Sequence, residues 1–242
     1  ILALILFIAG VALFAEIPSF EELENPKTNL ATQIISEDGK IINTYHIENR
    51  TFVEFDDLPE SLVDAAIATE DVRFHSHSGI DFRSLARVAV KSVLLGNVGA
   101  GGGGSTITQQ LAKTLFPREE ATSSFPGASL IKLVTTKFKE WITAVKLERN
   151  YTKDEILTMY MNTIFFGSNA YGIRSAANTF FAKDPIDLNI EESALLVGMV
   201  NKPTRYNPAI NPDHSLKRRN HVLSQMYKYG YLEGAFSRAR HS

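Results

Sequence analysis

The chain has 242 residues, of which 44% are hydrophobic and 21% are charged, so it can bury a substantial core and is neither disordered nor fibrous. Its formal net charge of −2 gives no global sign of nucleic-acid binding, so any basic function must come from local clusters. The absence of cysteine excludes a disulfide framework and thiolate metal ligands.

The first fifteen residues are uncharged and nearly all aliphatic. As a helix they rise about 22 Å, which is less than the hydrocarbon core of a bilayer at about 30 Å. We therefore expect residues 1–17 to be a truncated transmembrane anchor. A cleaved signal peptide is the alternative, although no clear cleavage pattern follows Ala15. Residues 18–57 are predicted to be a linker with a short β-hairpin that turns at Asp38-Gly39.

A helix is predicted to begin near Pro59, because aliphatic side chains then recur at helical spacing. Glu70 falls on the same side of this helix as those aliphatic residues. A carboxylate among aliphatic neighbours loses hydration, which disfavours its charged form and suits it to accept a proton. Glu70 is therefore a candidate general base. The alternative is a glutamate that simply ends a helix at the surface.

Two histidines, His75 and His77, follow Glu70 and Asp71 closely and raise the question of a metal site. Histidines at positions i and i+2 do not share a helical face, and a defined third ligand is missing. We therefore predict no metal at this place. Instead we expect a histidine to hold the loop after the helix by hydrogen bonds.

Asp81 is predicted to cap a helix that runs to about Leu95. Three cations, Arg83, Arg87 and Lys91, repeat every four residues opposite an apolar face. This arrangement suits a helix that lies in an anionic membrane surface. An ordinary surface helix with solvated charges is the alternative.

The glycine run at 99–104 formally matches two nucleotide-binding patterns, but the P-loop lysine and a βαβ context are absent, so no nucleotide site is expected. A helix is predicted to begin just after it, because Thr106 and Gln109 have the spacing of a capping box. Gln110 and Lys113 then lie one turn apart on one side. A helix start with hydroxyl and amide groups and a following lysine suits phosphate binding.

A second carboxylate, Glu140, shares a helical face with Lys137 at i, i+3. The alternative is a surface ion pair of little energetic worth. The buried stripe of the same helix is predicted to consist of Phe138, Trp141, Ile142 and Val145.

Later helices are predicted from their first residues and their apolar spacing. Capping boxes are expected at Thr152 with Glu155 and at Asn189 with Glu192. The apolar residues of a last amphipathic helix are Leu216, Val222, Leu223 and Met226.

Several short blocks occur in a fixed order between roughly residues 58 and 226. They are Glu70-Asp71-x-x-Phe74-x-x-His77-x-Gly79, Gly104-Ser105-Thr106-Ile107-Thr108-Gln109-Gln110, Lys137-x-x-Glu140, Lys153-Asp154-Glu155-Ile156-Leu157, Gly167-x-x-Ala170-x-Gly172-Ile173, Pro203-x-x-Tyr206-x-Pro208 and Arg218-Arg219-Asn220. In this order they resemble the glycosyltransferase module (family 51) of class A penicillin-binding proteins and of monofunctional peptidoglycan glycosyltransferases.

The resemblance implies a mainly α fold with a lysozyme-like bilobal glycosyltransferase head and a small membrane-facing jaw. The glycosyltransferase domain would occupy residues 58–242, with the jaw at roughly 80–104, and the chain would be the N-terminal part of a bifunctional protein. It would sit on the bacterial cytoplasmic (inner) membrane with a single N-terminal anchor and its catalytic domain on the outer (periplasmic) face. The implied partners are lipid II, the nascent glycan strand, the membrane and cell-wall synthesis proteins, with no nucleic acid.

The resemblance also implies roles for individual residues. Glu70 would remove a proton from the 4-hydroxyl of lipid II, whose oxygen attacks the anomeric carbon of the growing glycan and forms a β-1,4 bond with inversion. Glu140 would be the second catalytic carboxylate. Lys113 and Lys137 would neutralise the departing polyprenyl diphosphate, with a divalent cation (Mg or Mn) left open as a cofactor there. The residues expected to shape and line the substrate cleft are Asp71, Phe74, His77, Thr106, Gln109 and Gln110.

The sequence departs from the family pattern at four positions. Thr136 stands where an arginine is usual beside Lys137, Thr158 where a glutamate is usual, and Phe180 and Ala182 where tyrosine and glycine are common. The missing arginine puts the affinity for diphosphate in question, but not the reaction class. Two alternatives stay open: a lytic transglycosylase or lysozyme-like hydrolase, and a non-catalytic scaffold for cell-wall assembly.

Overall fold

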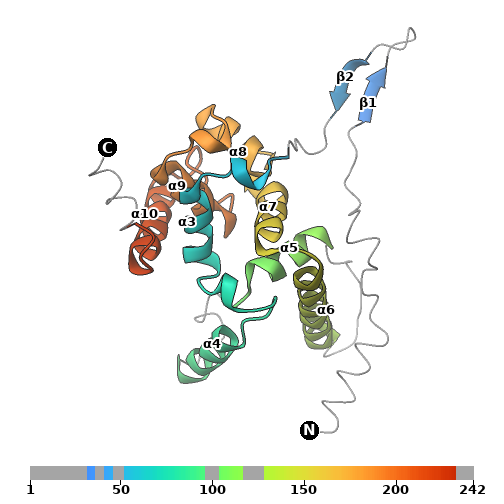
Figure 1. Ribbon diagram of the computed structural model, residues 1–242, viewed down its shortest axis with the longest axis vertical. Helices are drawn as coiled ribbons and strands as arrows, with labels where there is room; N and C mark the ends of the chain where they lie inside the picture. Colours follow the sequence, from blue (N-terminus) through green and yellow to red (C-terminus); the bar gives the residue numbers. More distant parts are fainter. Residues whose placement is uncertain (1–31, 36–40, 46–51, 96–103, 117–127, 233–242) are drawn as a thin grey trace. The chain divides into compact units, whose positions relative to one another are not determined.

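The structure is a computed structural model that describes residues 32–35, 41–45, 52–95, 104–116 and 128–232 (Figure 1). Eight α-helices, three short 3-10 helices and two sheets of two strands each make up this described part. The prediction of a mainly α fold is confirmed. Within the described residues no helix has both the length and the apolar character needed to cross a bilayer. The predicted anchor at 1–17 lies outside them.

The predicted N-terminal hairpin is present as two antiparallel strands, β1 (Thr32–Ile35) and β2 (Ile41–Tyr45). Thr32 pairs with Tyr45, and the register shifts between Ile34 and Ile35. The expected turn at Asp38-Gly39 lies outside the described residues.

The chain divides into two compact units. Unit 1 consists of Ile1–Lys27 and Ser76–Ile156, and unit 2 consists of Thr28–His75 and Leu157–Ser242. The chain therefore passes from unit 2 to unit 1 inside the predicted Glu70 to Gly79 block.

In unit 1, helix α5 (Ile107–Leu115) packs along the long helix α6 (Ala128–Asn150), as Figure 1 shows. The unit also contains α4 (Phe82–Leu95) and the first turn of α7 (Lys153–Thr163). The predicted cap of α4 is confirmed, because one carboxylate oxygen of Asp81 accepts hydrogen bonds from the backbone amides of Arg83 and Ser84, each at 3.1 Å.

The predicted buried stripe of α6 is wrong. Its four large apolar residues are only half-buried, whereas the buried positions in this part of the helix are Glu140, Thr143, Ala144 and Leu147. Gly79 approaches the main chain of this helix closely: a Cβ on Gly79 would lie 2.8 Å from the Ala144 carbonyl carbon. Tertiary packing, not the largest side chains, therefore selects the buried face, and Glu140 lies on it.

In unit 2, three helices pack against one another: α3 (Glu60–Glu70), α9 (Ile190–Val200) and α10 (Pro212–Lys228) (Figure 1). The remaining elements are α8 (Ile173–Phe181), the strands β3 (Phe165–Gly167) and β4 (Ala170–Tyr171), and the 3-10 helices η1 (Phe55–Asp57), η2 (Phe74–Ser76) and η3 (Pro185–Asp187). Apolar burial joins the three-helix group, since Leu62, Leu196 and Val222 have almost no exposed surface.

Two predicted capping boxes are confirmed. The amide of Thr152 donates to the Glu155 carboxylate at 2.7 Å and the amide of Glu155 donates to the Thr152 hydroxyl at 3.3 Å, which starts α7. Asn189 and Glu192 form the same reciprocal pair at the start of α9. The last amphipathic helix is confirmed as α10, although Leu216 is exposed.

Candidate active site

Glu70 is the last residue of α3 and is largely buried, with 11% of its side chain exposed. Glu70 forms an ion pair with Arg218 of α10, whose Nη2 lies 3.7 Å from Oε1 of Glu70; the Arg218 side chain is 18% exposed. The prediction that Glu70 lies beside the apolar side of its helix agrees with this burial. The alternative of an exposed glutamate at a helix end is wrong.

Two further acidic groups lie near Glu70. Asp71 is buried, and Tyr160 of α7 has almost no exposed surface. Burial is the main cause that raises the pKa of the Tyr160 hydroxyl well above its ordinary value, and the negative charges of Glu70 and Asp71 raise it further. The phenol is therefore neutral at physiological pH and keeps its proton as a hydrogen-bond donor.

Arg218 has a defined place between two other groups. Its Nε donates to the carbonyl oxygen of Gly198 at 3.3 Å, and its guanidinium carbon lies 5.6 Å from the centre of the Tyr206 ring. The sequence pattern placed Arg218 in a block but predicted no role for it. Helical spacing was an available signal, because Arg218 is three residues after the buried Ser215 and four before the buried Val222.

Phe74, predicted to shape the cleft, is fully buried in η2. Its ring meets that of His75 edge to face with centroids 5.3 Å apart, and its amide donates to the Asp71 carbonyl oxygen at 2.8 Å. Phe74 therefore fixes the turn after Glu70 and does not itself present surface to solvent.

Glu140 of α6 is the second candidate carboxylate, and its side chain is 7% exposed. Lys137 lies one turn earlier with its Nζ 2.5 Å from Oε2 of Glu140, while its own side chain is 37% exposed. An ammonium has three donors, so the exposed part of Lys137 can still meet an anion from solvent. The alternative of a pair at the surface is wrong for the carboxylate, which is buried.

Thr106 and Gln109 hold the Gly79 loop to the start of α5. The Thr106 hydroxyl donates to the Gly79 carbonyl oxygen at 2.7 Å, and the Gln109 side-chain amide donates to the same oxygen at 3.1 Å. The Thr106 hydroxyl also accepts from the Gln109 amide, as a cap should. The predicted capping box is therefore wrong in one half, because the Gln109 side chain bonds Gly79 instead of the Thr106 amide.

The same loop is tied down at a second point. Lys153 donates to the His77 carbonyl oxygen at 2.7 Å and to the Glu148 carboxylate at 2.8 Å. The Thr108 hydroxyl donates to the same Glu148 carboxylate oxygen, Oε1, at 2.5 Å. The hydrogen bond from Lys153 thus holds His77 through its main-chain carbonyl oxygen.

The two remaining predicted residues lie on α5, where Gln110 is half-buried and Lys113 is exposed in the last turn. The described residues contain no group of three or more His, Cys, Asp or Glu side chains able to hold a metal ion. A divalent cation at the diphosphate stays a prediction.

The predicted site residues are divided between the two units. Unit 2 contains Glu70, Asp71 and Phe74, and unit 1 contains His77, Thr106, Gln109, Gln110, Lys113, Lys137 and Glu140. A single groove shared by Glu70 and Glu140 stays a prediction.

Comparison with known proteins shows what this chain is similar to. The profile of a family described as Transglycosylase matches residues 38–227. The chain is 38% identical over 225 residues to "Penicillin-binding protein 1A" of Neisseria flavescens, covering 93% of this chain and 27% of that protein. It is 37% identical over 225 residues to the protein of that name from Pseudomonas aeruginosa (93% and 26%), and 36% identical over 222 residues to the one from Aquifex aeolicus (92% and 29%).

The chain thus spans about a quarter of the length of these relatives. Among solved structures, Penicillin-Binding Protein 1A from Haemophilus influenzae matches 84% of this chain and 18% of that chain, at 22% sequence identity and a TM-score of 0.40.

Proposed function

Because the chain belongs to the transglycosylase family, we propose that it is a peptidoglycan glycosyltransferase that joins lipid II units into glycan strands. One observation carries the proposal: the residues matched by the family contain two largely buried carboxylates, Glu70 and Glu140, each beside a cation. Buried carboxylates beside fixed cations are typical of sites that move protons and stabilise charge.

In the proposed reaction Glu70 accepts the proton of the 4-hydroxyl group of lipid II. The oxygen forms a bond to the anomeric carbon of the growing strand as the bond from that carbon to the polyprenyl diphosphate breaks. The attack comes from the face opposite the leaving group, so the new β-1,4 linkage has inverted configuration. Diphosphate is already a good leaving group, so the step needs a base and charge neutralisation more than a strong acid.

The lysines of unit 1 are proposed to stabilise the departing diphosphate. Lys137 supports this role because Glu140 fixes its position while more than a third of its side chain faces solvent. Lys113 is exposed at the end of α5 and supplies a second positive charge. Thr136, half-buried beside Lys137, offers a hydroxyl but no charge where relatives of the family usually have arginine.

We place the reaction at a membrane surface, because the substrate carries a polyprenyl chain; the outer face of the bacterial cytoplasmic membrane is the location that the family resemblance implies. Helix α4 supports this location. Phe82 and Val90 are 71% and 58% exposed, and the cations Arg83, Arg87 and Lys91 on the same helix are exposed as well. Exposed apolar side chains together with exposed cations suit a helix that lies in an anionic bilayer surface.

The direct test is to incubate the purified chain with lipid II in detergent and to size the products. The proposal predicts consumption of lipid II and the appearance of long strands. A hydrolase or lytic transglycosylase would instead shorten purified glycan strands, and a scaffold would bind without changing either. Either of these two results with folded protein contradicts the proposal.

A further inference from the structure

We propose that Arg218 is the positioning residue of Glu70: a guanidinium held by Gly198 and Tyr206 offsets the negative charge of the Glu70 carboxylate and keeps that carboxylate in one orientation. This inference rests on the proposed function, since it gives Glu70 the part of the base. Arg218 is not itself assigned a contact with substrate. We call the Gly198 carbonyl, the Tyr206 ring and Arg218 together the arginine clamp.

Contacts with Gly198 and Tyr206 restrict the Arg218 side chain from its stem to its guanidinium. A Cβ on Gly198 would lie 3.1 Å from Cγ of Arg218, so the glycine leaves room for the arginine stem against α9. The Nε then reaches the Gly198 carbonyl oxygen at 3.3 Å, and the guanidinium faces the Tyr206 ring. A guanidinium over an aromatic face is attracted by the ring quadrupole, which favours this one arrangement.

The main chain that carries this ring is hydrogen-bonded. The amide of Tyr206 donates to the Lys202 carbonyl oxygen at 3.0 Å, which closes a turn directly after α9. The clamp thus consists of Gly198 from α9, Tyr206 from the turn after α9 and Arg218 from α10, and it holds Glu70, the last residue of α3. All these residues belong to unit 2, so the arrangement is a property of that unit alone.

The charges around Glu70 explain why a fixed cation matters there. Asp71 at the end of α3 is negative, and Tyr160 of α7 is neutral. Burial, followed by the charge of Arg218, lowers the pKa of His221 on α10, so this histidine is neutral at physiological pH. None of these three groups offsets a negative charge on Glu70, whereas Arg218 does so at 3.7 Å.

Loss of Arg218 from its largely buried ion pair with Glu70 should change the protonation of the Glu70 carboxylate in a known direction. Removing the guanidinium leaves the carboxylate largely buried beside another acid without this cation, which favours the protonated form in the variant. A protonated carboxylate cannot accept a proton from the sugar hydroxyl. Loss of Arg218 should therefore affect the acid side of the pH dependence of catalysis more than substrate binding.

The test measures lipid II polymerisation from pH 5 to pH 9 for Arg218→Met, with circular dichroism to confirm folding. We expect the acid limb of kcat to move to higher pH by about 1 unit or more. At neutral pH kcat should fall about tenfold to a hundredfold, with KM changed less than about twofold. A role in folding alone would not move the pH profile.

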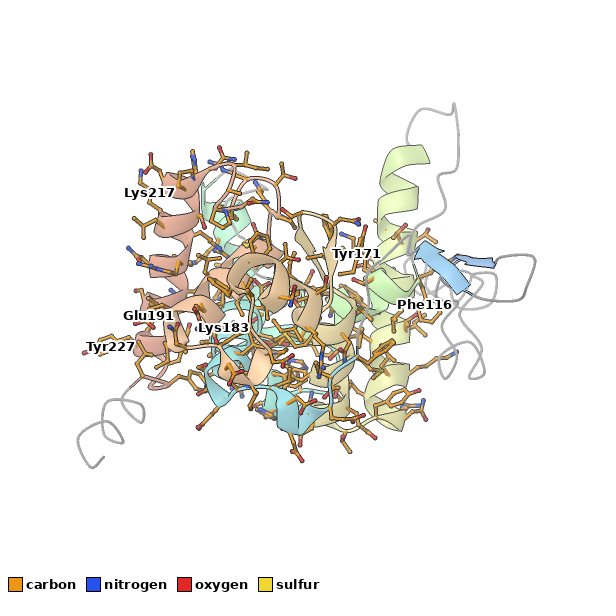
Figure 2. The ribbon with its side chains drawn as sticks, turned by 90° about the horizontal axis from the view of Figure 1, so that it is seen from above. Phe116, Tyr171, Lys183, Glu191, Lys217 and Tyr227 are labelled. Atoms are coloured by element: carbon orange, nitrogen blue, oxygen red, sulfur yellow. The ribbon has the colours of Figure 1, made fainter. Side chains whose placement is uncertain are left out.

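Arg218→Lys is the second variant and carries the test if Arg218→Met fails to fold. The ammonium keeps the charge but lacks the planar fork, so we expect an unshifted acid limb and a kcat lower by about tenfold. The matched control is Lys217→Met, which removes the neighbouring charge. Lys217 is exposed and points outward from α10 in Figure 2, so this variant should behave as wild type.

The outcomes separate the inference from the function on which it rests. A folded Arg218→Met with the wild-type pH profile, or Arg218→Lys with the wild-type kcat, overturns the inference. Glu70→Gln is measured alongside them. If Glu70→Gln polymerises lipid II at the wild-type rate, the assignment of the base fails instead, whatever the Arg218 variants do.

Discussion

Single residues of this chain carry contacts that other amino acids could not make. Gly79 combines a positive φ of +88° with a close approach to the backbone of Ala144, and its carbonyl oxygen accepts two hydrogen bonds from α5. The block from Glu70 to Gly79 could be found in the sequence, since its residues are contiguous. The reason why a glycine is needed at position 79 could not be found in the sequence, because the residue it approaches, Ala144, lies 65 positions further along the chain.

Replacing Gly79 by alanine is expected to destabilise the protein by about 2–4 kcal/mol, because the added Cβ combines left-handed backbone strain with a clash against main-chain atoms. The measurement is the free energy of unfolding in urea. Gly230→Ala is the control, since Gly230 also has a positive φ of +83° but has no neighbour within 4 Å of its Cβ position. It should cost about 1 kcal/mol. Equal losses for the two variants would contradict the role given to the Ala144 contact.

At Ala182 the structure explains why the family pattern commonly has glycine. Ala182 ends α8 in the left-handed conformation, with φ of 53° and ψ of 41°, a position that glycine usually occupies. Ala182→Gly is therefore expected to stabilise the protein by about 0.5–1 kcal/mol. Thermal unfolding would show this as a higher Tm, and a lower Tm would contradict it.

At the scale of the elements, helix starts were predictable and the buried face of α6 was not. The boxes at Thr152 and Asn189 depend on residues three positions apart, so the sequence contains both partners. The buried face of α6 depends on α5 and on the Gly79 loop, which are distant in sequence. For the same reason Arg218, whose partners come from three separate segments, was recognised as part of a block without a function.

Helix α4 carries the prediction that belongs to this scale. Replacing both Phe82 and Val90 by glutamate should reduce binding of the chain to anionic lipid vesicles at least about tenfold, because it removes apolar surface and adds like charge. Vesicle flotation measures this binding. Ile186→Glu changes an exposed apolar residue of η3 and is the control, which should float as wild type. Unchanged flotation of the α4 variant would contradict the membrane-facing role.

At the scale of the whole molecule, the two units each supply one of the two carboxylates on which the proposed reaction depends. The order of the blocks along the chain identified the family, which the match over residues 38–227 bears out. Sequence order cannot establish how groups from two units act together, since this depends on contacts that no local pattern encodes. That joint action is the central claim of the proposed function.

The measurement that tests it most directly is the rate of lipid II polymerisation by Glu70→Gln, by Glu140→Gln and by the double variant. Each single change should lower kcat by about a hundredfold or more, and the double variant should be little slower than the slower single one, because residues that serve one transition state are not additive. Glu191→Gln, which changes an exposed carboxylate of α9 labelled in Figure 2, is the control and should retain the wild-type rate. Losses that simply multiply in the double variant, or a Glu70→Gln variant that polymerises at the wild-type rate, would contradict the account.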